Sequence, residues 1–145
     1  MLKSLEKLNL ASNSLTSLPS SIDRLSNLQY LDISANLLTE IPVELCQLVS
    51  LRTLFLNDNQ FTKIPPEIRY LTNLQRLKIF NCKIEAFPEE LTELFELEEL
   101  DLYGNQIPFV PPSISKLTNL YDLYLGANLL TSIPPELGTF THYQF

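Results

Sequence analysis

Residues 28–38 read LQYLDISANLL, and the same arrangement of leucine, isoleucine and asparagine returns every 23 residues. Six copies follow the pattern LxxLxLxxNxLxx(L/I/V/F)Pxx(I/L)xx(L/F), with a few apolar exchanges and no change of spacing. So regular a period is typical of stacked units, none of which can bury its apolar face alone. The sequence therefore predicts one repeat domain over residues 1–145. Its copies begin at Leu5, Leu28, Leu51, Leu74, Leu97 and Leu120.

Each copy contains a short strand pattern followed by a helical one. Leu31 and Ile33 alternate with polar neighbours, and this period of two indicates a strand with one buried face. Successive strands joined by long crossovers must form a parallel sheet. Each crossover begins at a proline and then shows apolar residues three apart, which fits 3₁₀ helix or one or two turns of α-helix. We expect an α/β solenoid with a curved sheet on its concave side and helical crossovers on its convex side.

A polar residue recurs inside this apolar frame. Asparagine occupies the ninth position of five copies, where the chain turns after the strand. An inward amide donates and accepts hydrogen bonds, so we expect it to satisfy the turn and link adjacent coils. Cys82 fills the position in the fourth copy, and its weaker thiol should give a looser link. The other cysteine, Cys46, lies on a crossover and is expected to be partly exposed.

The repeat LxxLxLxxN, with LPSSIDRLSNL at residues 18–28, resembles leucine-rich repeats of the 23-residue intracellular type. Similar units occur in Ras-associated scaffolds, Scribble and Erbin, the Ras suppressor protein, plant Ras-group-related repeat proteins and bacterial repeat effectors. The resemblance implies a non-catalytic module that binds a protein partner through its concave face, in a signalling scaffold or an effector. The partner would be a small GTPase or a signalling enzyme. Alternatively, the chain is the substrate-recognition segment of a larger kinase, phosphatase or ubiquitin ligase.

The outward side chains of the strands form the candidate binding surface. Five of them are aromatic, a class enriched at interface hot spots, and charged residues surround them. The alternative is that neighbouring rings merely stack on one another along the sheet. The predicted partner-binding residues are Tyr30, Asp32, Phe55, Arg76, Lys78, Phe80, Glu99, Asp101, Tyr103, Asp122 and Tyr124.

Other kinds of site are poorly supported. The net charge of −7 and a pI near 4.6 argue against nucleic acid or an anionic membrane as the main partner. The only histidine, His142, lies where the repeat pattern decays, and no glycine-rich phosphate loop is present. We therefore predict no catalytic residues, metal or cofactor, and no membrane insertion.

The ends of the chain bear on its location and context. Residues 1–7 already follow the repeat pattern and contain no apolar stretch for export. We expect a cytoplasmic protein, or alternatively a bacterial effector acting in the host cytosol. Solenoids usually carry covering segments at their ends, and these termini look uncapped, which favours a fragment of a longer protein. Two alternatives are that residues 140–145 fold back as a cap, or that the ends pair between molecules.

Overall fold

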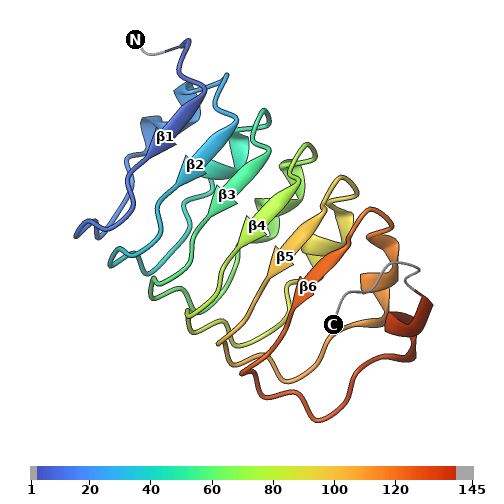
Figure 1. Ribbon diagram of the computed structural model, residues 1–145. Helices are drawn as coiled ribbons and strands as arrows, with labels where there is room; N and C mark the ends of the chain where they lie inside the picture. Colours follow the sequence, from blue (N-terminus) through green and yellow to red (C-terminus); the bar gives the residue numbers. More distant parts are fainter. Residues whose placement is uncertain (1–2, 140–145) are drawn as a thin grey trace.

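The computed structural model describes residues 3–139, which form a single row of six stacked coils (Figure 1). Each coil contributes one strand of three residues and one 3₁₀ helix. The strands are β1 (Lys7–Asn9), β2 (Tyr30–Asp32), β3 (Thr53–Phe55), β4 (Arg76–Lys78), β5 (Glu99–Asp101) and β6 (Asp122–Tyr124). The helices are η1 (Ser20–Arg24), η2 (Leu45–Gln47), η3 (Pro66–Tyr70), η4 (Glu89–Glu93), η5 (Pro112–Lys116) and η6 (Pro135–Thr139).

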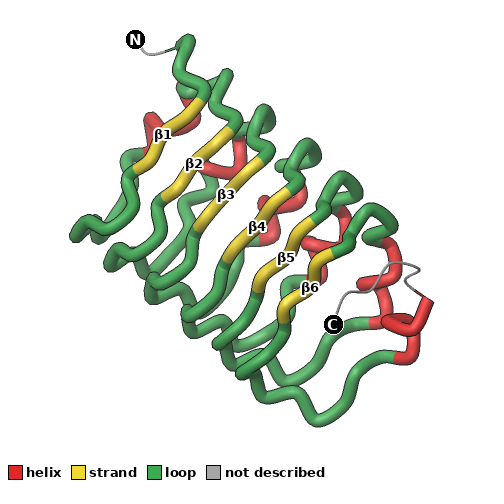
Figure 2. Tube along the Cα trace, viewed as in Figure 1, coloured by secondary structure: helices red, strands yellow, loops and turns green. Residues whose placement is uncertain are grey.

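The strands form one parallel sheet in the order β1 to β6. The register pairs residues that are 23 positions apart, such as Leu31 with Leu54 and Leu54 with Leu77. Figure 2 shows the sheet as one open layer, with the helices on its far side. This arrangement confirms the predicted solenoid. All crossover helices in residues 3–139 are of the 3₁₀ type, so the α-helical alternative does not occur there.

The core runs along the inside of the coils. Leu31, Leu54, Leu77 and Leu100 are all completely buried. Burial falls toward both ends, because an end coil has only one neighbour. Leu8 and Leu123 are only partly buried, and Ile133 remains 66% exposed at a motif position that is buried in the central coils. The alternative that residues 140–145 fold back as a cap concerns a segment outside the described residues.

The ninth-position asparagines form a ladder between coils. In Asn59 the side-chain oxygen accepts a hydrogen bond from the N–H of Leu38 at 3.0 Å. Its side-chain nitrogen donates to the carbonyl oxygens of Ile33 and Leu56, both at 3.0 Å. In the equivalent place the thiol of Cys82 donates only two long hydrogen bonds, from Sγ to two carbonyl oxygens at 3.7 and 3.6 Å. The weaker link expected at the fourth coil is therefore present.

A second ladder of hydrogen bonds, which was not predicted from the sequence, runs along the turns that follow η1, η2, η3 and η5. Asn73 donates to the carbonyl oxygen of Val49 and Asn119 donates to that of Phe95, both at 2.8 Å. Asn27 makes the same bond in the first coil, and the hydroxyl of Ser50 makes it in the second. In the sequence, the position that forms this ladder is the polar residue directly before the first leucine of each copy. These bonds hold the helix-side turns in register.

The eighth residue of each copy, three positions after its strand ends, turns the chain with positive φ. Five of these residues are not glycine: Ser12, Ala35, Asp58, Asn81 and Ala127, with φ between 50° and 57°. The sixth is Gly104, at φ 67°. The left-handed conformation is costly for residues with a Cβ, so stacking of the coils must compensate for it. This conformation makes the sharp turn that directs the ninth-position asparagine into the coil.

The expectation that Cys46 is partly exposed was wrong. The residue is completely buried, and Thr92, at the same motif position in the fourth coil, is 1% exposed. Burial at this position differs between coils, because Asp23, at the same position in the first coil, is exposed. Burial and the negative charge of Glu67 raise the pKa of the Cys46 thiol to about 12.

Candidate functional site

The outward side chains of the sheet form a continuous surface, here called the strand face. It faces the viewer in Figure 1, where β1 to β6 lie side by side. Side chains on a strand alternate between its two faces, so the third, fifth and seventh positions of every copy share this surface. The third position contributes Lys7, Tyr30, Thr53, Arg76, Glu99 and Asp122. The fifth contributes Asn9, Asp32, Phe55, Lys78, Asp101 and Tyr124, and the seventh Ala11, Ser34, Asn57, Phe80, Tyr103 and Gly126.

Tyr30 and Asp32 form a fixed polar cluster at the second coil. Asp32 is only 8% exposed, and its Oδ1 accepts hydrogen bonds from the backbone N–H of Ser34 at 3.0 Å and from the Ser34 hydroxyl at 2.6 Å. The hydroxyl of Tyr30 donates to Oδ2 at 3.3 Å, and the amide of Asn9 approaches the same oxygen at 3.4 Å. Burial, and to a smaller extent the charge of Asp32, raise the pKa of Tyr30. These contacts hold the tyrosine ring in place.

The next ring and the neighbouring cation are also paired within the molecule. Phe55 meets Tyr30 edge to face, with ring centroids 5.7 Å apart and planes at 77°. The Nζ of Lys78 lies 5.3 Å from the centroid of the Phe55 ring and 2.8 Å from Oε1 of Glu99. Arg76 approaches the same glutamate at 4.0 Å. Charges from the fourth and fifth coils therefore partly neutralise one another.

The fifth and sixth coils present a different surface. Tyr103 and Tyr124 are 49% and 47% exposed. A Cβ added to Gly126 would lie 3.0 Å from Cδ2 of Tyr103, so the tyrosine ring lies over this glycine. Asp101 accepts the backbone N–H of Tyr103 at 3.0 Å, yet burial raises the pKa of its carboxyl. The Tyr103 amide and the charge of Lys78 oppose this rise, and Glu99 adds to it.

All eleven residues predicted from the sequence lie on the strand face, but they form two groups. The first joins Tyr30 through Phe55 and Lys78 to Glu99 by direct contacts. The second is the exposed set around Tyr103 and Tyr124 in the last two coils. Phe80 is half-buried and lies between the groups on the diagonal that the spacing predicts. The stacking alternative applies to Tyr30 and Phe55, the one ring pair within residues 3–139. The role of these residues in binding stays a prediction.

The sequence analysis did not predict the residues that hold the candidate binding residues in position. Asn9 and Ser34 hold Asp32, and Gly126 makes room for the ring of Tyr103. All occupy outward positions, so their location was foreseen. Their contacts were not, because each depends on side-chain length and on which neighbour lies across the register.

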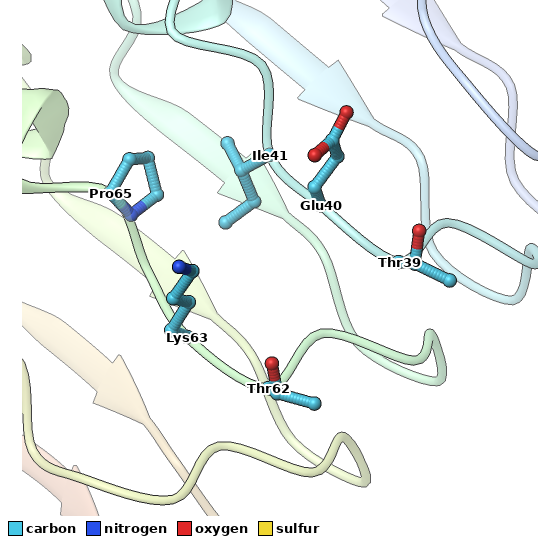
Figure 3. Close-up of a pocket in the computed structure, with 6 residues that line it drawn as sticks. All are labelled: Thr39, Glu40, Ile41, Thr62, Lys63 and Pro65. Carbon is cyan, nitrogen blue, oxygen red and sulfur yellow. The ribbon is translucent and has the colours of Figure 1, made fainter.

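A shallow cavity of about 300 Å³ lies away from the strand face (Figure 3). It is lined by Thr39, Glu40, Ile41, Thr62, Lys63 and Pro65, from the loops that lead out of the second and third coils' strands. Within residues 3–139, no group of three or more His, Cys, Asp or Glu side chains is arranged to hold a metal ion. No helix in the same range is long and apolar enough to cross a membrane.

Two protein-family models match this chain. The family described as "Leucine-rich repeat region" matches residues 1–85, and "Leucine Rich repeats (2 copies)" matches residues 96–137. The chain belongs to the leucine-rich repeat family. This family and fold are typically non-catalytic modules for protein–protein interaction. A comparison with curated proteins finds none that matches the chain.

Solved leucine-rich repeat structures match almost the whole chain. A protein from Leptospira interrogans is 36% identical at a TM-score of 0.90, over 99% of this chain and 38% of that one. The ectodomain of the receptor kinase GASSHO1/SCHENGEN3 from Arabidopsis thaliana, in complex with CASPARIAN STRIP INTEGRITY FACTOR 2, is 31% identical at 0.89, over 98% and 18%. The plant peptide hormone receptor RGFR1, in complex with RGF2, is 36% identical at 0.89, over 100% and 24%. The chain thus spans well under half the length of these relatives.

Proposed function

We propose that this chain is a non-catalytic interaction module of a signalling scaffold or an effector, and that it binds a protein partner through the strand face. One observation carries the proposal: five aromatic side chains lie on one continuous face, and two of them, Tyr103 and Tyr124, remain about half exposed there. Large exposed aromatic surfaces mark interaction sites more often than they mark ordinary solvent-facing surface.

The internal contacts of the first group fit a preorganised binding surface. Tyr30 and Phe55 are held by Asp32 and by each other, and Lys78 is held by Glu99. A partner that meets side chains already fixed in place loses less conformational freedom on binding. Two similar structures contain protein or peptide partners, CASPARIAN STRIP INTEGRITY FACTOR 2 and RGF2, which supports a protein partner here. We propose a small GTPase or a signalling enzyme as that partner.

The proposed location is the cytoplasm, with the host cytosol as the alternative for a bacterial effector. Cell fractionation with an antibody against this chain tests the proposal. Recovery of the protein in the extracellular fraction would overturn it.

Affinity capture from native lysate, with quantitative mass spectrometry, tests the binding face. The test variant carries Phe55→Ala, Phe80→Ala and Tyr103→Ala. The control carries Val49→Ala, Tyr70→Ala and Phe95→Ala, which remove three exposed apolar side chains outside the strand face. We expect the test variant to lose about tenfold or more of the captured partner and the control to keep it. Circular dichroism confirms that both variants fold. Equal capture by both folded variants would refute the proposal.

A second proposal is that the chain is the recognition segment of a larger enzyme. It is favoured by the length comparison, because the chain spans only 18% of the receptor kinase ectodomain that it resembles. The gene sequence tests it directly. A reading frame that continues into a kinase, phosphatase or ubiquitin ligase domain supports the proposal, and a frame without such a domain refutes it.

A further inference from the structure

Six strand-face positions of the fifth and sixth coils, here called the C-terminal grid, differ in chemistry from the rest of the surface. The grid consists of Glu99, Asp101, Tyr103, Asp122, Tyr124 and Gly126. The register places Glu99 opposite Asp122 and Asp101 opposite Tyr124. Carboxylates therefore occupy one end of the grid, and tyrosines occupy the other.

The negative charge of the grid is only partly compensated. Lys78 binds Glu99 at 2.8 Å. Within residues 3–139, no ion pair joins Asp101 or Asp122 to a cation. Glu99 and Asp122 face each other across neighbouring strands, and like charges in that relation are unfavourable. A cation placed beside Asp101 and Asp122 would relieve this repulsion.

The tyrosines of the grid are available to a partner, unlike the rings of the second and third coils. Tyr30 and Phe55 are already paired with each other. In the part of the chain described here, neither Tyr103 nor Tyr124 has a ring partner, and both are about half exposed. The ring of Tyr103 lies over Gly126, where no side chain covers it. The face of a tyrosine ring attracts an ammonium or guanidinium group.

We propose that the C-terminal grid binds an extended basic segment of a partner protein. One arginine or lysine side chain of this segment lies against Tyr103 and Tyr124 and places its cation beside Asp101 and Asp122. This inference rests on the proposed function, that the strand face binds protein, and names the chemistry of the partner.

Geometry and overall charge favour such an occupant. Alternate residues of an extended chain are about 7 Å apart, which is also the spacing of successive outward positions along these strands. Side chains of the segment can therefore meet successive positions of the grid. The chain carries a net charge of −7, which attracts cationic partners and repels polyanions such as nucleic acid.

Fluorescence anisotropy with labelled peptides of about ten residues tests the proposal. One peptide alternates serine with arginine, and a second alternates serine with glutamine. The test variant carries Asp101→Asn and Asp122→Asn. An asparagine at 101 still accepts the Tyr103 amide bond through its side-chain oxygen. The matched control carries Glu85→Gln and Glu96→Gln, which remove the same number of charges from exposed sites outside the strand face.

We expect the arginine peptide to bind the wild-type chain about tenfold or more tightly than the glutamine peptide. The Asp101→Asn, Asp122→Asn variant should lose most of that preference, and the control should change affinity less than about twofold. A single Tyr124→Ala change should also weaken binding, whereas Tyr70→Ala, at a similarly exposed residue outside the strand face, should not.

Three results would overturn the proposal: equal binding of both peptides, equal losses in the test and control variants, or sedimentation showing that a second copy of the chain occupies the grid. The lysate capture experiment separates this inference from the proposed function. If the aromatic triple variant loses its partner while Asp101→Asn, Asp122→Asn keeps it, the strand face binds protein and the basic-segment inference fails.

Discussion

The side-chain nitrogen of Asn59 lies 3.0 Å from the carbonyl oxygen of Ile33, 26 residues earlier in the chain. This bond joins the third coil to the second. The same side chain also accepts the N–H of Leu38, so one residue satisfies backbone groups of two coils. The continuous strand face depends on links of this kind, because each coil is too small to hold its shape alone.

Asn59→Ala should therefore destabilise the chain more than Asn13→Ala. Asn59 is buried, and its loss leaves buried backbone groups of two coils unsatisfied, at a cost of about 2–3 kcal/mol. Asn13 is exposed and bonds only to carbonyl oxygens of its own coil, so we expect a cost below about 1 kcal/mol. Urea denaturation followed by circular dichroism measures both changes. Equal losses would show that the bonds between coils contribute little.

Cys82→Asn should stabilise the chain. The amide would replace two long sulfur contacts with shorter hydrogen bonds and would accept the backbone N–H of Phe61, which now faces the thiol. We expect a gain of about 1 kcal/mol, or about 3 °C in Tm. Cys82→Ala is the control and should lower Tm. A Tm of Cys82→Asn at or below that of the wild type would contradict this account of the ladder.

Glu96→Asn should extend the second ladder. At this position Asn73 and Asn119 donate to carbonyl oxygens of the preceding coil, but the carboxylate of Glu96 has no N–H to donate. A new bond at this exposed site should add about 0.5–1 kcal/mol to the free energy of unfolding. Glu96→Gln, which removes the charge but places the amide one bond further out, separates the hydrogen bond from the charge. If both variants gain equally, removal of the charge explains the effect.

The stability of the chain should fall as the pH rises above about 9. Burial raises the pKa of Cys46 to about 12, whereas the unfolded thiol ionises near its ordinary value of 9.0. Between these values the unfolded state has released a proton that the folded state retains, so the free energy of unfolding drops by about 1.4 kcal/mol per pH unit. Cys82 and Tyr30, whose pKa values are also raised, add to the slope at high pH.

Denaturation of the wild type and of Cys46→Ala between about pH 8 and 10.5 isolates the contribution of Cys46. The variant is expected to be less stable near neutrality, because a buried sulfur is lost, but to have a shallower slope above pH 9. Parallel slopes would mean that the folded thiol ionises normally.

Gly104→Ala should destabilise the turn after β5. Its φ of 67° is costly for a residue with a Cβ, and the new Cβ would lie 2.5 Å from Oδ1 of Asn81. We expect a loss of about 1–2 kcal/mol in the free energy of unfolding. Gly138→Ala is the matched control, because no atom lies within 4 Å of the added Cβ. A Gly104→Ala variant as stable as Gly138→Ala would show that the coil absorbs the strain.

The sequence was most informative where one feature recurs in every coil. Leu31 and its equivalents face the core because the strand alternates with a period of two, and the asparagines turn inward because the same backbone groups need partners in each copy. The burial of Cys46 was wrongly predicted because its motif position is not buried in every copy: Cys46 and Thr92 are buried, whereas Asp23 is exposed. The turn near Ala35 was predicted but its positive φ was not, since alanine carries no local signal for that conformation.

The sequence alone determined the coil, the parallel sheet and the set of side chains that point outward, because these follow from local patterns repeated at a constant spacing. Only the tertiary structure decided which of those side chains satisfy one another. Phe55 pairs with Tyr30 and Lys78 from the two neighbouring coils, whereas Tyr103 and Tyr124 remain half exposed. The physical reason is that contacts on the strand face form across coils and along diagonals. They depend on the reach and orientation of each side chain, which the repeat pattern leaves free to vary.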